Sequence, residues 1–372
     1  MELSHYIWPD AAFAAAAAAW FSAMLLVLTK PLHGRFTSGG ELGVQAAHTE
    51  PTPRIGGLAI YFSVVLGTYL IGGESRHLLM GIVLAGTPAF AFGLLEDCTR
   101  KVSVASRLFA TLGSGVLGWL VTGLTITDVD VPWLNILLLW TPVAVVFTAF
   151  AVGGVANAFN IIDGFNGLAT GTAMIVLAAM GLLGLHLGDP QLSNVCVVLA
   201  ATATGFLLVN WPFGKLFLGD GGAYFLGFSV AWVAVLLLER HAEVSAWCPL
   251  LICAYPVLEV VFSMLRRRGR RSNMMHPDRL HLHSLIKRRI VRQLFPFTHP
   301  TLRNSITGAV LWLMTLLPAL WAVLFFDNTP LLVLGMLIFG VAYQALYVRL
   351  VWFGWKRLWR RDDLSAVPSS KS

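Results

Sequence analysis

The sequence predicts an all-α, polytopic membrane protein of about eleven transmembrane helices. Hydrophobic residues make up 57% of the 372 residues and charged residues only 12%, with a mean hydropathy of +0.73. The apolar runs have the length of about 17 to 25 residues that a helix needs to cross a membrane. They lack the period-2 alternation of membrane strands, and a helix satisfies its backbone hydrogen bonds internally. We therefore expect one transmembrane domain over residues 1–372.

Each apolar run predicts one helix, in chain order. The first follows an acidic start without a basic n-region, so we expect a retained helix rather than a cleaved signal peptide. No Pro/Ser-rich linker divides the chain, and the four cysteines lack the CxxC spacing of a zinc site. The motifs described below occupy residues 30–290, and two further helices and a basic tail occupy 306–372. The predicted helices cover residues 11–29, 55–72, 78–95, 108–125, 134–156, 172–188, 193–209, 223–239, 248–265, 306–326 and 331–350.

Basic residues predict the orientation. Of the 26 Lys and Arg residues, all except Arg76 and Arg240 fall in one alternate set of gaps. Lys and Arg are retained on the cytoplasmic side, so we expect the N-terminus outside and the C-terminus in the cytoplasm. The net charge of +7 then reflects topology and attraction to membrane lipids, and no nucleic-acid partner is expected.

Four polar segments interrupt the apolar sequence, all at gaps that this topology places on the cytoplasmic side. They cover residues 96–101, 157–171, 217–222 and 276–283. Their carboxylates, amides and histidines are the groups used in divalent-metal and phosphate chemistry. Outer turns such as residues 188–191 are expected only to reverse the chain. The sequence therefore predicts a functional site at the cytoplasmic membrane face.

The segment 157–171 carries the most informative spacing. Asn157, Asn160 and Asp163 recur every three residues, which places them along one face of a helix end. Asn166 follows between two glycines, which allow a sharp turn or a close approach to a ligand. Oxygen donors of this kind suit Mg²⁺, with Mn²⁺ as an alternative. The competing interpretation is a polar helix cap.

Two other segments supply carboxylates. Asp220 lies between glycines at the start of an apolar helix, where it could bind a metal beside a phosphate or simply cap the helix. Glu96 and Asp97 are adjacent and are followed by Arg100 and Lys101. Adjacent carboxylates repel, so they favour a site with a metal or a basic partner, although a solvated loop would look similar.

Histidines and basic residues complete the candidates. His281 and His283 lie near Arg279 in a basic loop, where contact with phosphate oxygens is favoured over a zinc site because no carboxylate or Cys lies at ligand spacing. Solvated histidines are the alternative. Arg54 stands at the start of the second helix, as a phosphate contact or as a membrane anchor. Glu259 lies inside an apolar run and is expected to be paired or to line the site.

In this order the segments resemble the polyprenyl-phosphate N-acetylhexosamine-1-phosphate transferase family, which includes undecaprenyl-phosphate N-acetylglucosaminyl 1-phosphate transferases. The family forms glycosyltransferase family 4. The resemblance implies transfer of a sugar 1-phosphate from a UDP-N-acetylhexosamine to undecaprenyl phosphate, with Mg²⁺, at the inner face of a bacterial cytoplasmic membrane. A homodimer is left open. The matching segments are HTEPTPRIGG, GLLEDCTRK, NAFNIIDGFNGLATG, FLGDGGAYFLGF, YPVLEVVFSMLRR and HPDRLHLHSLIKRR.

The resemblance also implies roles for single residues. Asp220 is implied as a metal ligand with Asn160 close by, and Glu96, Asp97, Asp163, His281 and His283 as catalytic residues. A phosphate monoester is mostly dianionic at neutral pH and needs no strong base, so we favour Asp97 as a positioner or proton acceptor over a covalent nucleophile. The residues that we expect to bind substrate are Arg54, Arg100, Lys101, Asn157, Asn166 and Arg279.

Three positions depart from the family pattern, and two other functions are alternatives to the transferase. Glu96 and Asn166 stand where the family has Asp, and Ser284 where it has His. Asn166 removes a charge and therefore puts the usual sugar preference in doubt. A non-catalytic carrier or flippase for lipid or nucleotide-sugar is the main alternative, although carriers tend to place polar groups at the membrane midplane in paired halves. A prenyltransferase would require DxxD motifs, and the sequence has none.

Overall fold

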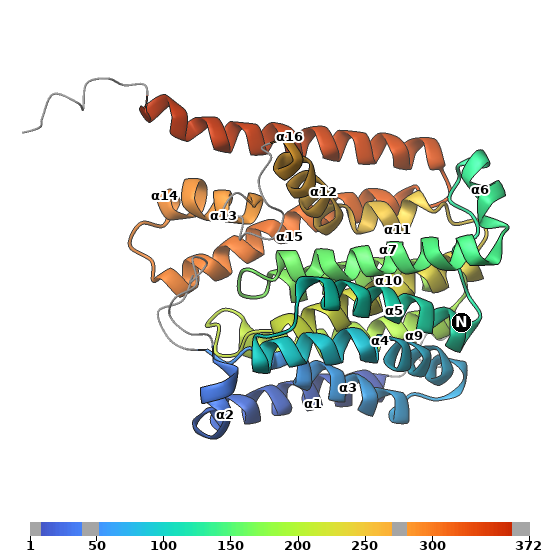
Figure 1. The fold of residues 1–372 in the computed structure, drawn as a ribbon, viewed down its shortest axis with the longest axis horizontal. Helices are drawn as coiled ribbons and strands as arrows, with labels where there is room; N and C mark the ends of the chain where they lie inside the picture. Colours follow the sequence, from blue (N-terminus) through green and yellow to red (C-terminus); the bar gives the residue numbers. More distant parts are fainter. Residues whose placement is uncertain (1–8, 39–51, 270–280, 359–372) are drawn as a thin grey trace, which may run out of the picture.

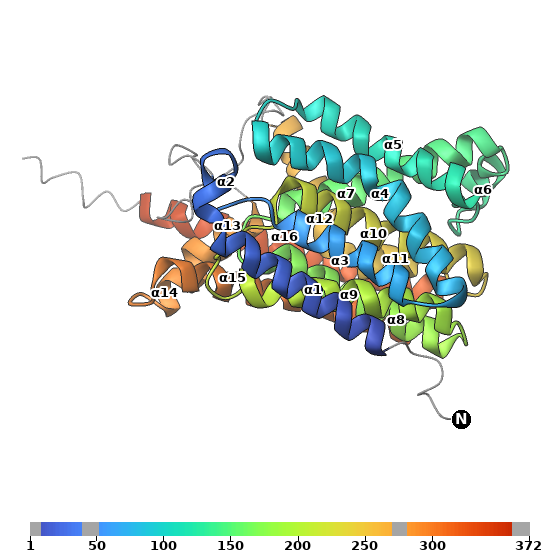
Figure 2. The same ribbon diagram turned by 90° about the horizontal axis from the view of Figure 1, so that it is seen from below.

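A computed structural model describes residues 9–38, 52–269 and 281–358, and within these ranges it contains helices and no strand. Most helices lie side by side along the long axis of the molecule (Figure 1). The short elements α2, α13 and α14 lie at one end and α6 at the other, and a second view agrees (Figure 2). The predicted all-α membrane bundle is confirmed.

Every predicted apolar run coincides with one or more helices. In the described part of the chain, nine helices are long and apolar enough to cross a membrane. The elements are α1 (Pro9–Leu28), α2 (Lys30–Thr37), α3 (Gly56–Leu70), α4 (Gly73–Thr99), α5 (Val104–Thr122), α6 (Pro132–Leu138), α7 (Thr141–Ile162), α8 (Leu168–His186), α9 (Pro190–Asn210), α10 (Gly219–Arg240), α11 (Trp247–Ile252), α12 (Ala254–Gly269), α13 (Leu282–Ile286), the π-helix η2 (Lys287–Val291), α14 (Arg292–Leu294), α15 (Pro300–Leu324) and α16 (Thr329–Leu358).

The other two predicted crossings fall on shorter helices. The run at 55–72 forms α3, which has 15 residues. The run at 248–265 is divided between α11 and α12 at Cys253. Pro256 lacks a backbone N–H, so it is tolerated in the first turn of α12 but would interrupt one continuous helix. The predicted orientation of the termini stays a prediction.

Helix α10 forms the centre of the bundle. It packs against α3, α4, α7 and α8, and 89% of its most apolar window is buried. Phe225, Phe228 and Trp232 on α10 are fully buried. An apolar membrane helix can also face lipid, as α1 does with only 28% of its window buried, so the central position of α10 follows from its contacts and not from its hydropathy.

Glycines let α3 and α4 reach the start of α10. A Cβ atom on Gly57 would collide with the backbone of Gly222, and one on Gly93 would lie 2.5 Å from the backbone nitrogen of Gly221. Contacts between backbones leave no room for a side chain. The glycines around Asp220 therefore bring three helix ends together.

These contacts predict different effects of two glycine-to-alanine substitutions. We expect Gly93→Ala to lower the free energy of unfolding by about 1 to 3 kcal/mol, because the methyl group overpacks a backbone contact. Gly113 also lies inside a helix, but a Cβ there meets nothing within 4 Å, so Gly113→Ala should be neutral or stabilising by up to about 1 kcal/mol. Thermal unfolding in lipid nanodiscs measures both variants. Equal losses in the two would contradict the packing argument.

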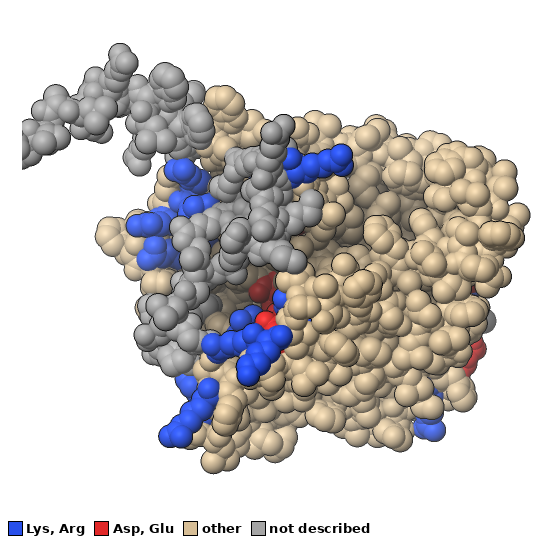
Figure 3. Space-filling view, viewed as in Figure 1, with Lys and Arg blue, Asp and Glu red and all other residues tan. Residues whose placement is uncertain are grey.

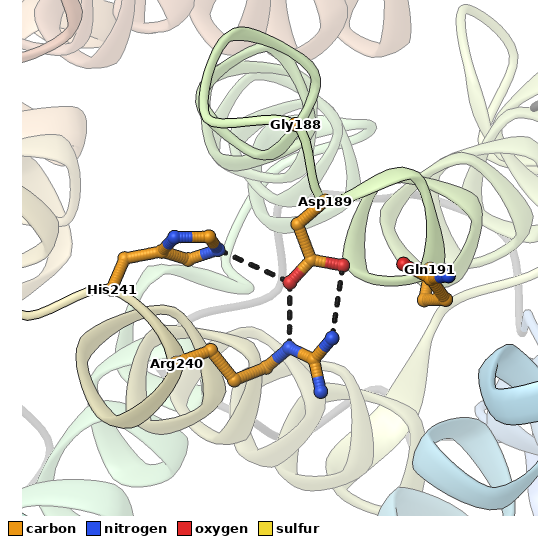
Figure 4. Close-up of a pocket in the computed structure, with 5 residues that line it drawn as sticks. All are labelled: Gly188, Asp189, Gln191, Arg240 and His241. Atoms are coloured by element: carbon orange, nitrogen blue, oxygen red, sulfur yellow. Dashed lines mark hydrogen bonds and ion pairs between the residues drawn. The ribbon is translucent and has the colours of Figure 1, made fainter.

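The other end of α10 is held by a polar cluster (Figure 4). Arg240 donates from Nε to Asp189 at 2.6 Å and from Nη2 at 3.1 Å, and Nη1 donates to Glu74 at 2.6 Å. His241 Nε2 lies 3.1 Å from the same Asp189 carboxylate. Burial raises the pKa of Asp189, but the hydrogen bonds from Arg240 outweigh it and hold this pKa below its usual value. The turn at 188–191, expected only to reverse the chain, therefore also ties α8 and α9 to α10 and α4.

Candidate active site

The predicted site residues within the described ranges lie around one end of the bundle. They come from the ends of α4 and α7, the start of α10, the segment before α3 and the start of α13. Acidic side chains lie in a recess bordered by Lys and Arg side chains (Figure 3). Arg279 lies outside the described residues.

Asp220 is the residue that several side chains of this site contact. It lies in the first turn of α10 and is 8% exposed. Asn160 on α7 donates from Nδ2 to its Oδ1 at 3.1 Å, and Arg107 on α5 donates to its Oδ2. Arg54 lies 3.7 Å from Oδ1. The structure thus brings together Asp220, Asn160 and Arg54, as the sequence predicted, and adds Arg107.

Asp97 holds the start of α10. Its two carboxylate oxygens accept the backbone N–H groups of Asp220 and Gly221, each at 2.9 Å. These groups are among the donors that the first turn of a helix leaves unsatisfied. Gly219 just before them has φ +76°, and a Cβ there would overlap the carbonyl oxygen of Arg54. Asp97 therefore fixes where the Asp220 carboxylate lies.

The neighbouring charged residues lie on the last turn of α4 and the turn that follows it. Glu96 Oε2 accepts the backbone N–H of Val102 at 2.9 Å. Arg100 has φ +55° and donates to the carbonyl oxygen of Ser38, and Lys101 is exposed. Glu96 is close enough to Arg107 for an electrostatic interaction. These residues border the site, whereas Asp97 lies inside it.

Asp163 follows the last turn of α7 and faces the same charges. Burial raises the pKa of the Asp163 carboxyl to about 7. Arg54 and the backbone N–H of Gly219 oppose the rise, and the negative charge of Asp220 adds to it. Two carboxylates held this close in a partly buried site favour a bound cation or a proton.

The raised pKa predicts how Asp163 affects stability. From about pH 4 to pH 7 the folded protein keeps a proton at Asp163 that the unfolded chain releases, so rising pH lowers the unfolding free energy by up to about 4 kcal/mol. We expect Asp163→Asn to raise the melting temperature at pH 8 but not at pH 4. Thermal unfolding in the presence of a metal chelator measures the melting temperatures at both pH values. The control is Asp128→Asn, which changes an exposed aspartate. A pH-independent difference would contradict it.

His281 and His283 lie against the Asp163 loop. The two rings stack, with centroids 5.1 Å apart and an interplanar angle of 11°. The His283 ring meets Phe165 edge to face at 5.3 Å, and a Cβ on Gly164 would lie 3.3 Å from His283 Nε2. Both histidines are less than 10% exposed. They are thus packed side chains in contact with the site, not solvated ones.

The structure places two predicted amides away from the carboxylates. Asn157 donates to Thr111 Oγ1 at 2.8 Å and to the carbonyl oxygen of Gly153 at 2.7 Å. Asn166 is 2% exposed and donates to Ser305 Oγ at 3.1 Å. In this structure Asn166 joins the loop to α15, which explains why an uncharged residue fits there.

Sequence reasoning missed two basic residues of the site. From the sequence alone Arg107 indicates membrane topology. A charged residue four positions into an apolar helix nevertheless needs a partner, and in the structure this partner is Asp220. Lys287 Nζ lies 5.2 Å from the centre of the Phe165 ring. Burial lowers the pKa of Lys287 to about 8, and the charge of Arg303 adds to the effect.

The donor set fits the predicted metal, although the described residues contain no group of three or more His, Cys, Asp or Glu that could hold an ion alone. Asp220 and Asp163 supply carboxylate oxygens, and Asn160 supplies an amide. Mg²⁺ needs only one or two carboxylates when water and substrate phosphates complete its coordination. A Mg²⁺ ion here would complete its coordination with water and substrate phosphates.

Fold and site define an integral membrane protein with a carboxylate, arginine and histidine site at one end of its helical bundle. The pattern of glycosyl transferase family 4 matches residues 79–238. Together with the relatives described next, this shows that the chain belongs to glycosyl transferase family 4.

Curated relatives align over the larger part of the chain. The probable undecaprenyl-phosphate N-acetylglucosaminyl 1-phosphate transferase of Bacillus subtilis (strain 168) is 30% identical over 238 residues, which are 63% of this chain and 66% of the relative. The undecaprenyl-phosphate alpha-N-acetylglucosaminyl 1-phosphate transferase of Yersinia pestis is 29% identical over 249 residues, 65% of this chain and 67% of the relative. That of Escherichia coli (strain K12) is 26% identical over 246 residues, 65% and 66% of the two chains. The chain thus spans about two thirds of these relatives.

Proposed function

We propose that the protein transfers the sugar 1-phosphate of a UDP-N-acetylhexosamine to undecaprenyl phosphate as a first membrane step of cell-envelope glycan synthesis. An oxygen of the lipid phosphate attacks the phosphorus that carries the sugar, and the bond between the two donor phosphates breaks. UMP leaves, and the lipid carries a diphosphate-linked sugar. The names of the relatives support this reaction, and its coarser form, sugar-phosphate transfer to a polyprenyl phosphate, has the strongest support.

The observation that carries the proposal is the convergence of Arg54, Arg107 and Asn160 on Asp220 at a helix end. Both substrates are anionic, so repulsion between them is the main barrier, and fixed positive charge lowers it. A phosphate monoester with a second pKa of about 6 is already mostly dianionic at pH 7, so it needs no strong base. Lys287 supplies a further donor for phosphate oxygens.

Mg²⁺ would be held by Asp220, Asp163 and Asn160. When bound, it neutralises phosphate charge and favours in-line geometry. The other residues of the site have separate roles. Asp97 fixes the position of Asp220, and the two arginines attract the phosphates.

The position of the charged residues favours a transferase over a carrier. Carriers tend to hold polar groups near the middle of the membrane, between broken helices. Here the carboxylates lie at helix ends, at positions 96, 97, 163 and 220. A site at the membrane boundary suits one substrate from the lipid and another from water.

Purified protein in nanodiscs with undecaprenyl phosphate and Mg²⁺ tests the proposal. A panel of UDP-N-acetylhexosamines is supplied, and UMP release and lipid-linked sugar are measured together. Stoichiometric formation of both products supports the transfer and identifies the donor. If no donor gives UMP and labelled lipid moves across the vesicle bilayer, the transferase proposal is wrong and the carrier function is favoured.

Orientation has a test that requires no substrate. The location in the cytoplasmic membrane, with the site facing the cytoplasm, is part of the proposal, and a homodimer stays a prediction. Cys98 beside Asp97 is exposed, whereas the other three cysteines are buried. A membrane-impermeant maleimide should label Cys98 only after cells are permeabilised, whereas an Asp128→Cys variant at the opposite end should react in intact cells. Labelling of Cys98 in intact cells would overturn the orientation.

A further inference from the structure

Glu259 is a buried carboxylate with three hydrogen-bond donors around it. It lies on α12 and is 1% exposed. His281 Nδ1 lies 2.9 Å from Oε1, and the backbone N–H of Leu282 donates to the same oxygen at 3.0 Å. The hydroxyl of Tyr343 on α16 donates to Oε2 at 2.9 Å. Both oxygens of this carboxylate are thus engaged.

The contact with Glu259 determines the state of the His281 ring. A carboxylate can only accept, so the proton of a neutral His281 lies on Nδ1, and Nε2 carries the lone pair. The ring also stacks on the nearly parallel ring of His283, which packs against Gly164 and Phe165. A continuous chain of contacts therefore joins Tyr343 on α16 to the loop that carries Asp163.

Tyr343 is itself held in place by packing. It is 3% exposed, and its ring meets Phe262 of α12 edge to face at 5.6 Å. Tyr347, one turn further along α16, meets the same Phe262 at 4.7 Å and accepts a hydrogen bond from Arg266 at 3.2 Å. The second tyrosine thus shares the packing of the first but contacts Arg266 in place of Glu259.

We propose that Glu259 and Tyr343 are positioning residues that hold His281 in one orientation with Nδ1 protonated, so that Nε2 is the ring nitrogen left to accept a proton in the site. Tyr343 lies on the last helix, outside residues 79–238 that the family pattern matches. The last helix therefore contributes to the site and does not serve only as a membrane anchor. The consequence for turnover rests on the proposed function, whereas the state of the ring does not.

The state of the ring is tested by solid-state NMR of ¹⁵N-histidine protein in lipid vesicles. Loss of one signal in a His281→Gln variant assigns the ring. We expect the Nδ1-protonated form in the unmodified protein and a mixture of tautomers in Glu259→Leu, which keeps the volume but removes the acceptor. An Nε2-protonated ring, or an unchanged spectrum in Glu259→Leu, would overturn the proposal whatever reaction the protein performs.

The effect on turnover is tested by kcat and KM for UMP release. We expect Tyr343→Phe to lower kcat about 3- to 10-fold, the value of one hydrogen bond, with little change in either KM. Glu259→Leu should lower kcat about 100-fold, and Glu259→Gln, which keeps an acceptor, should recover part of it.

Tyr347→Phe is the matched control, because it removes a hydroxyl of the same helix that contacts Arg266 and not Glu259. It should leave kcat unchanged. Equal losses of kcat in Tyr343→Phe and Tyr347→Phe, accompanied by equal losses of thermal stability, would reduce Tyr343 to a packing residue and overturn its positioning role. If the unmodified protein releases no UMP, the proposed function fails, and the NMR result still decides the positioning.

Discussion

Asp220→Asn is expected to lower the rate of UMP release by at least about 1,000-fold, the size of loss seen when a charged group that acts on the transition state is removed. The side chain keeps its shape, so Asn160 and the helix start can stay in place. The negative charge that faces Arg54 and Arg107 is lost. Without it the arginines no longer have a fixed position, and the proposed metal loses a carboxylate ligand.

The measurement is UMP release at saturating donor and lipid phosphate, over a range of Mg²⁺ concentrations. Asp128→Asn, an exposed aspartate in the loop after α5, is the control and should keep full activity. Circular dichroism and thermal unfolding establish that the variant is folded. A folded Asp220→Asn protein with more than about a tenth of the normal rate would mean that the site has been placed wrongly.

Asp97→Asn should be almost as damaging, but for a different reason. Both oxygens of Asp97 accept backbone N–H groups at the start of α10, and an amide presents one oxygen and one NH₂ group. One of the two backbone donors then faces another donor. We expect a loss of about 1 to 3 kcal/mol in unfolding free energy, because a buried N–H is left unsatisfied, and a fall in UMP release of about 100-fold or more.

The adjacent carboxylate provides the comparison. Within the part of the chain that the structure describes, Glu96 accepts one hydrogen bond, from the N–H of Val102. An amide oxygen can also accept it, so Glu96→Gln should cost at most about 10-fold in rate. The two measurements together distinguish a positioner from a base. Loss of activity in Asp97→Asn with no loss of stability would show that Asp97 takes part in the chemistry itself.

The arrangement of helices could largely be predicted from the sequence, because lipid makes long apolar segments helical whatever their neighbours. What failed was the assumption of continuity. The run at 248–265 is divided at Cys253, before Pro256, and the run at 134–156 is divided between α6 and α7. Helix α3 keeps nearly its predicted bounds, and its first two residues donate hydrogen bonds to the carbonyl oxygens of residues 217 and 218. Such contacts join distant parts of the chain, so local hydropathy contains no sign of them.

The site could be predicted in part. Asp97, Asn160, Asp163 and Asp220 were identified from their types and spacing, and the structure places them together. The partners of Asn157 and Asn166 could not be predicted, because spacing along a helix gives the face of a residue but not the group opposite it. Arg107 was overlooked because a basic residue near a helix end is explained equally well by membrane topology.

Helix α10 is fastened at both of its ends. Asp97 accepts hydrogen bonds from its first turn, and its last residue, Arg240, donates hydrogen bonds to Asp189 and Glu74. Its glycines also touch the backbones of α3 and α4, so sliding or rotation of this helix would break contacts at both ends and along its length. We therefore expect conformational changes to involve the surrounding loops and helices before α10 itself, and the proposed reaction would rely on such changes to admit and release its substrates.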